Sequence, residues 1–242
     1  MIEENNIALP SAQFSEGLRS YMLRVYNYMI GGLLVSALFA WLGTSEPMLR
    51  LMFNINEVQG EVSYSIPGLI ILLAPFVFIP LVHSSAQKLN VVKAQFFFWA
   101  YSAIDGLSLS FLCLIYSGSS ITTAFLLTAV TFSALSLYGY TTQRDLTGIG
   151  QFCFIGLIGV IISLIVNMFL GSEPLSYLLS IILVLLFIGL TAFDTQKIRC
   201  NYQLSASNEE THALAIVGAL ELYLDFINLF INILRLTGSR QK

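Results

Sequence analysis

Seven separate runs of mostly apolar residues, each close to the length that crosses a lipid bilayer, constrain this chain more than any other feature. A transmembrane helix needs about 20 such residues to span a hydrocarbon core about 30 Å thick. Only 10% of the residues are charged, whereas a soluble domain carries about 25%. The chain is therefore predicted to be an all-α membrane protein with seven transmembrane helices, over Tyr21–Gly43, Ile66–Val82, Lys93–Tyr116, Ile121–Tyr138, Gly148–Leu170, Leu175–Ile198 and Ala213–Leu236.

Short connections between these runs predict a single membrane domain. Residues 1–20 form a polar N-terminal segment that lacks the basic stretch and short apolar core of a signal peptide. Residues 21–242 then form one seven-helix domain, in which the lipid bilayer is the main partner.

Composition and motifs exclude several classes of function. The net charge of −3 excludes a basic surface for nucleic acid. The three cysteines form no CxxC pair, so neither a zinc site nor a disulfide framework is indicated. The chain has no phosphate-binding loop, dinucleotide fingerprint, HExxH or GxSxG stretch. We therefore expect neither an enzyme nor a resident cofactor.

The distribution of Lys and Arg predicts the orientation, because cytoplasmic loops of membrane proteins are enriched in these residues. With the N-terminus in the cytoplasm, seven of the eleven basic residues lie on the inner side if the last run crosses fully. If the last run re-enters without crossing, ten lie on the inner side. Both counts place the N-terminus inside, and they leave the side of the C-terminus open.

The last run carries a polar stripe on an otherwise apolar helix. Glu221, Asp225, Asn228 and Asn232 are spaced by four, three and four residues, so at 100° per residue they fall within an arc of about 60°. Such a stripe must face protein or water, because hydrocarbon would leave it unsatisfied. It indicates either an ion or proton path, lined by these residues, or hydrogen bonding that only holds helices together.

Two further acids lie within or at the edge of the predicted spans. Asp105 is near the centre of its run, with Ser102 and Ser108 one turn away, and is a second pore-lining candidate or a carboxyl bonded to a neighbouring helix. Asp194 could pair with Lys197 one turn later. No Lys or Arg lies at the middle of a span. These carboxyls are therefore expected to be protonated, to face water or to hold a cation.

Several stretches resemble the transmembrane Bax inhibitor motif family, with similarity over nearly the whole chain. The two signature stretches are Thr191–Ile198, with the sequence TAFDTQKI, and Leu222–Phe230, with the sequence LYLDFINLF. Two others, Tyr21–Met29 and Ala134–Tyr140, resemble bacterial members in particular. The resemblance implies a multi-pass protein of the bacterial inner membrane.

This resemblance also implies a fold and a function. The last of seven helices is expected to be central, surrounded by the other six. Family members are associated with pH-sensitive Ca²⁺ leak, and in bacterial members two aspartates of the last two helices act as pH sensor and gate. On this sequence these are Asp194 and Asp225, which would also be the ligands of any bound Ca²⁺.

The sequence departs from the family pattern in three places. Glu221 stands where members commonly have a small or hydroxyl residue, so the stripe has an additional acid. Some bacterial relatives have a basic residue at the end of the second span, and here only His83 or Lys88 could replace it. Asp105 has no counterpart in the pattern. The electrostatics of the gate are therefore expected to differ.

Three hypotheses follow. The first is a pH-sensitive leak channel for cations, most simply Ca²⁺, gated by Asp194 and Asp225. The second is a regulatory membrane protein that acts through membrane protein partners and carries no ion flux. The third, an intramembrane aspartyl protease, is disfavoured because its GxGD stretch is absent and Asp194 lies near a helix end.

Overall fold

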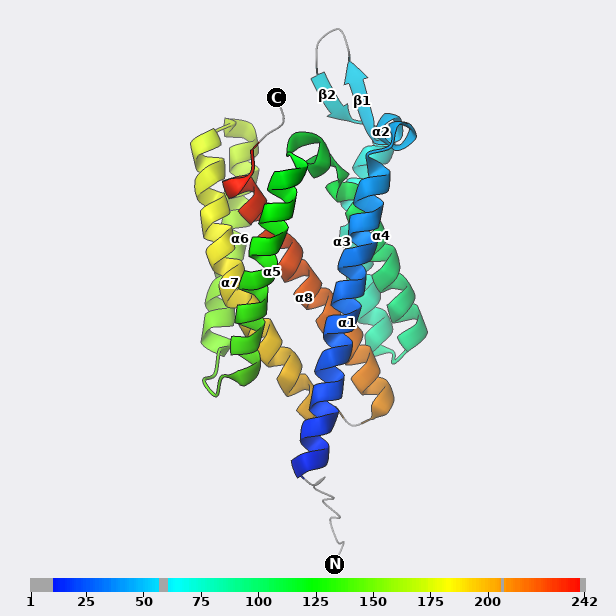
Figure 1. The fold of residues 1–242 in the computed structure, drawn as a ribbon, viewed down its shortest axis with the longest axis vertical. Helices are drawn as coiled ribbons and strands as arrows, with labels where there is room; N and C mark the ends of the chain where they lie inside the picture. The colour runs from blue at the N-terminus through cyan, green and yellow to red at the C-terminus, as the bar shows by residue number, and fades with distance from the viewer. Residues whose placement is uncertain (1–10, 57–60, 206, 240–242) are drawn as a thin grey trace, which may run out of the picture.

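Ten elements make up the computed structural model, which describes residues 11–56, 61–205 and 207–239 (Figure 1). Seven of the helices in these ranges are long and apolar enough to cross a membrane. The elements are α1 Ser11–Gly43, α2 Glu46–Met52, β1 Phe53–Asn56, β2 Glu61–Tyr64, α3 Ile66–Gln87, α4 Val91–Ile115, α5 Gly118–Thr141, α6 Thr147–Leu170, α7 Glu173–Leu204 and α8 Asn208–Thr237.

The prediction of an all-α protein with seven spans is confirmed, with one addition. The link between α1 and α3 contains the short helix α2 and an antiparallel hairpin in which Phe53 pairs with Tyr64. Figure 1 shows this hairpin projecting at the end of the bundle where the C-terminus lies.

Polar caps extend the helices beyond the predicted apolar runs. Side chains of Ser65, Asn90, Ser117, Ser172 and Ser207 each accept a hydrogen bond from a backbone N–H of the first turn, which satisfies a donor that a helix start leaves free. A helix can therefore begin in polar sequence. The helix α1 likewise begins at Ser11, so part of the segment predicted at residues 1–20 is helical, while residues 1–10 lie outside the described ranges.

The last long helix, α8, lies in the centre of the bundle. None of its residues from Ala213 to Leu234 is exposed, and it packs against α1, α3, α4, α5 and α7. The central position is confirmed, but α6 packs mainly against α7, outside the ring around α8. Figure 1 shows α8 running obliquely through the bundle from the N-terminal end to the opposite end.

Seven crossings place the two termini at opposite ends of the bundle (Figure 1). The question left open by the basic residues is thereby answered: α8 crosses fully, and Arg235 lies at the end opposite the N-terminus. The N-terminal end has seven of the eleven basic residues of the chain, so it faces the cytoplasm by the positive-inside rule.

Candidate functional site

The two predicted gate residues, Asp194 of α7 and Asp225 of α8, lie side by side. Each carboxyl acts on the other electrostatically, and Oδ2 of Asp225 is buried without a hydrogen-bond partner among the described residues. Asp225 is only 4% exposed, and the pair lies where α7 crosses the central helix. The structure therefore brings together two residues that are 31 positions apart in the sequence.

A cation lies beside this carboxyl pair. The Nζ atom of Lys197 is 2.7 Å from Oε1 of Glu221 and 3.9 Å from Oδ1 of Asp194. The expected pairing of Asp194 with Lys197 is therefore confirmed, and Glu221 is an additional and closer partner of Lys197. Lys197 lies one turn after Asp194 on α7 and reaches across to α8, with its side chain 41% exposed. Some bacterial relatives have a basic residue near the two aspartates, and the family pattern offered only His83 or Lys88 for that role. In this structure Lys197 is the basic residue beside the aspartates.

The two stripe asparagines bond to their own helix and, among the described residues, to no neighbouring helix. Asn228 donates from Nδ2 to the carbonyl of Leu224, and Asn232 donates from Nδ2 to the carbonyl of Asn228, each at 2.8 Å. These bonds do not hold two helices together. The hydrogen-bonding explanation of the stripe therefore does not describe these amides.

Three oxygens of the stripe are buried without a hydrogen-bond partner in the part of the chain that the structure describes. They are Oε2 of Glu221, Oδ2 of Asp225 and Oδ1 of Asn232. Buried polar atoms of native proteins are nearly always paired, so each unpaired one calls for a physical explanation. All three oxygens lie on the same face of α8.

Asp105 belongs to a separate polar network, on the opposite face of α8. The hydroxyl of Tyr223 donates to Oδ2 of Asp105 at 2.6 Å and lies 2.6 Å from Oγ of Ser36. Ser36 also donates to the carbonyl of Ser102 at 2.8 Å. This network joins α1, α4 and α8, which is the interhelical role considered for Asp105. The structure does not bring Asp105 to the carboxyl pair.

Tyr223 was not singled out in the sequence, because a tyrosine among leucines and phenylalanines resembles one more large apolar side chain. Its ring packs edge-on against Phe98 and Tyr101 of α4. Close helix contact supports the same network, since a Cβ added to Gly106 of α4 would lie 2.4 Å from the carbonyl oxygen of Ser36. Two helices can approach this closely only over a glycine.

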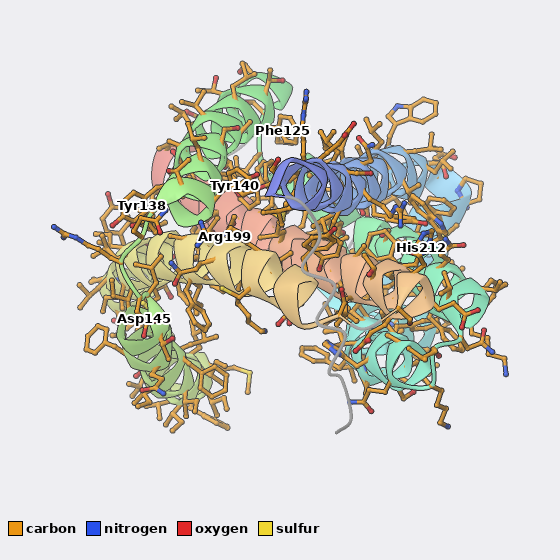
Figure 2. The ribbon with its side chains drawn as sticks, turned by 90° about the horizontal axis from the view of Figure 1, so that it is seen from below. Phe125, Tyr138, Tyr140, Asp145, Arg199 and His212 are labelled. Atoms are coloured by element: carbon orange, nitrogen blue, oxygen red, sulfur yellow. The ribbon has the colours of Figure 1, made fainter. Side chains whose placement is uncertain are left out.

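The helices α5 and α7 are joined at the cytoplasmic end. Nη1 of Arg199 donates to the carbonyl of Tyr140 at 2.5 Å, and deeper in the bundle Oγ of Ser136 lies 3.0 Å from Oγ1 of Thr195. Figure 2, which looks onto this end, shows Tyr140 and Arg199 next to each other and His212 well apart from them. The segment of α7 that carries Asp194 and Lys197 is therefore held on its α5 side.

A resident metal ion finds few ligands here. Within the described ranges, no group of three or more His, Cys, Asp and Glu side chains could hold a metal ion. A Ca²⁺ site in proteins uses about six to eight oxygen ligands, and Asp194 and Asp225 together offer four. The predicted Ca²⁺ contact at this pair would therefore concern an ion in passage.

Comparisons with known proteins agree with the fold. A family model described as inhibitor of apoptosis-promoting Bax1 matches residues 18–242. The chain is 44% identical to an uncharacterised protein of Rickettsia prowazekii, over 94% of this chain and 93% of that protein. It is 40% identical to the inner membrane protein YbhL of Escherichia coli K12, over 93% of this chain and 94% of that protein.

A membrane protein of Streptococcus pyogenes is 36% identical over 93% of this chain and 95% of its own length. The match to the family model covers the seven spans and both signature stretches. The relatives are named as membrane or inner membrane proteins, which agrees with a multi-pass protein of the bacterial inner membrane. The chain therefore belongs to the Bax inhibitor family.

Proposed function

We propose that this protein is a pH-sensitive leak channel for cations, with Ca²⁺ as the ion to test first, and that Asp194 and Asp225 form its gate. On this proposal the two carboxyls share a proton in the packed state and thereby hold α7 against the central helix. A change in the protonation of the pair changes that contact. We propose that it thereby opens or closes a path for cations along the polar face of α8.

The observation that carries the proposal is the close approach of the two carboxyls in a site where Asp225 is only 4% exposed. When the shared proton is lost, two negative charges face each other in a site shielded from water, where their repulsion is much stronger than in solution. Lys197 offsets part of this charge, but it is already engaged by Glu221 at 2.7 Å. The contact between α7 and α8 is therefore sensitive to pH.

The polar face of α8 favours a cation over an anion. Four carboxyl or amide side chains lie along it, at 221, 225, 228 and 232, and three of their oxygens are buried without a partner in the described residues. Carboxylate and carbonyl oxygens are the ligands that Ca²⁺ and other hard cations take. A dehydrated cation that passes this face would satisfy these oxygens in turn.

The test is Ca²⁺ flux into liposomes that contain the purified protein, measured between pH 5 and pH 8. The proposal expects a flux that changes with pH in the native protein and loses this dependence in Asp194→Asn and in Asp225→Asn. Asp105→Asn is the matched control, because it neutralises a buried carboxyl on the opposite face of α8 and should keep the pH dependence.

Flux no greater than that of empty liposomes at every pH, with all four proteins folded, would overturn the proposal. The regulatory hypothesis would then be favoured, in which the polar face of α8 binds or supports contacts with another membrane protein. Flux with the same pH dependence in all four proteins would keep the channel and reject the gate.

A further inference from the structure

Apart from the polar face of α8, a polar cavity lies at the cytoplasmic end of the bundle, between α1, α4 and the first turns of α8. Its volume is about 560 Å³, and its lining includes Ser20, Arg24 and Asn27 of α1, Gln95 and Trp99 of α4, and His212 of α8. We call this cavity the headgroup pocket. The gate described above does not use any of these residues.

The charges of the headgroup pocket all have one sign. Arg24 lies close enough to His212 to act on it electrostatically, and no Asp or Glu is among the described residues that line the cavity. Arg24 forms no ion pair in the described part of the chain. The guanidinium of Arg24 therefore faces the cavity without a counter-charge, and a bound anion would supply one and would favour protonation of His212. The pocket thus favours a negatively charged ligand.

The other lining groups are suited to a phosphate group. Guanidinium groups bind phosphate through two parallel hydrogen bonds. Ser20, Asn27 and Gln95 add a hydroxyl and two amides that can donate to the remaining oxygens, although Gln95 already donates one bond to the hydroxyl of Tyr28. A phosphate in the pocket would therefore meet both charge and hydrogen-bond donors.

The position of the pocket identifies the source of that phosphate. It lies at the end of the bundle where basic residues are concentrated, beside the aromatic side chains of Tyr28 and Trp99. Trp, Tyr and basic side chains at this level are typical of the lipid headgroup region. Next to the pocket, Leu23 and Phe96 are exposed on the outer surfaces of α1 and α4, where they would contact acyl chains.

We propose that the headgroup pocket binds the phosphate of an anionic phospholipid of the cytoplasmic leaflet. The bound lipid would link α1 and α4 to the start of α8, the helix that carries the carboxyl pair. Figure 2 shows His212 at this start of α8, well away from Arg199 and Tyr140. Binding of the lipid does not depend on the proposed ion leak, so the two can fail separately.

The test uses Trp99 as a reporter within the pocket. The chain has two tryptophans, so Trp41→Phe leaves Trp99 alone in an otherwise native chain. This protein is placed in phosphatidylcholine vesicles that contain either brominated phosphatidylglycerol or brominated phosphatidylcholine at equal mole fraction. Bromine quenches tryptophan on contact. We expect phosphatidylglycerol to be favoured about fivefold, the preference that one basic side chain gives at an anionic surface.

Substitutions then assign this preference to the pocket. Arg24→Gln combined with His212→Gln should reduce it to about one, and Arg24→Lys, which keeps the charge but loses the paired bonds, should reduce it in part. Arg19→Gln is the matched control, since Arg19 is exposed on the same helix and borders a different, apolar groove between α1 and α5. It should leave the preference unchanged.

Three outcomes would overturn the proposal. The first is equal quenching by both brominated lipids in the protein with Arg24 and His212 intact. The second is a preference that persists in a folded double variant. The third is an equal change in Trp99 fluorescence when inorganic phosphate is added to vesicles of phosphatidylcholine alone, which would assign the pocket to a soluble anion.

Discussion

The two faces of helix α8 give buried acids different partners. On one face Tyr223 donates to Asp105 and joins three helices through a hydroxyl network. On the other face Asp225 meets a second carboxyl, that of Asp194, with Lys197 and Glu221 paired beside them. The first acid has a neutral donor, and the second faces another acid, with which it shares a proton in the function proposed above.

This difference separates a structural role from a regulatory one. A network of hydroxyl groups and one carboxyl keeps its bonds as long as the helices stay in contact. A pair of carboxyls keeps its bond only while it holds a proton. Burial alone is therefore a poor sign of function, because both acids are in the bundle interior, and the identity of the partner distinguishes them.

The largest expected effect comes from removing the cation beside the carboxyl pair. Lys197→Met leaves Glu221 and Asp194 without their counter-ion, which should lower the free energy of unfolding by about 2 kcal/mol, since solvent around the half-exposed lysine screens part of the full cost. Thermal unfolding in detergent measures this. Lys197→Met combined with Glu221→Met should recover most of the loss, and a double variant no more stable than the single one would contradict the pairing.

The next effect should appear on the opposite face. Tyr223→Phe removes the only hydrogen-bond donor to Asp105 among the described residues, so it should cost about 1–2 kcal/mol of stability and leave the pH profile of ion flux unchanged. Tyr177→Phe, at an exposed position on α7, should cost nothing measurable. A Tyr223→Phe protein with an altered pH profile would mean that both faces of α8 belong to the gate.

The smallest effect concerns a carboxyl outside the membrane, which serves as a reference for the two buried ones. Hydrogen bonds from the side chain of Thr147 and then from its backbone N–H, the latter at 2.9 Å, hold the pKa of Asp145 below the ordinary value of 3.8. Its contribution to stability is therefore present near neutral pH and is lost as the pH falls below 3.8.

Asp145→Ala should lower the unfolding temperature slightly at pH 7 and by progressively less as the pH falls through that range. Thermal unfolding at several pH values checks this, with Asp145→Asn, which keeps an acceptor oxygen, as control. A difference between Asp145→Ala and the native protein that is constant down to pH 3 would contradict the assignment.

The spans and the polar stripe could be predicted from the sequence because each depends on local pattern. Apolar runs report the solvent around a helix, and spacing by three and four residues reports one helical face. The predicted positions of the helix ends were less accurate. Asn90, Ser117 and Ser172 extend them through side-chain caps that hydropathy does not detect.

Partners across helices could not be read from the sequence. Lys197 was considered only for Asp194 on its own helix, whereas its shorter contact is with Glu221 on α8. The partner of Asp105 was equally hidden, since nothing local indicates that Tyr223 faces α4. Such pairs depend on the rotation and tilt of packed helices, which a pattern along one helix does not specify. The pairing of Asp194 with Asp225 was expected only through the family resemblance.

Infrared spectroscopy of the protein in lipid tests the central claim, that Asp194 and Asp225 share a proton, most directly. The measurement is made in an Asp105→Asn background, so that this other buried carboxyl does not contribute. We predict a C=O stretching band of a protonated carboxyl that disappears at alkaline pH in the background protein and is absent when Asp225→Asn is added. A spectrum without such a band at any pH between 5 and 8, or a band that survives Asp225→Asn, would contradict the claim.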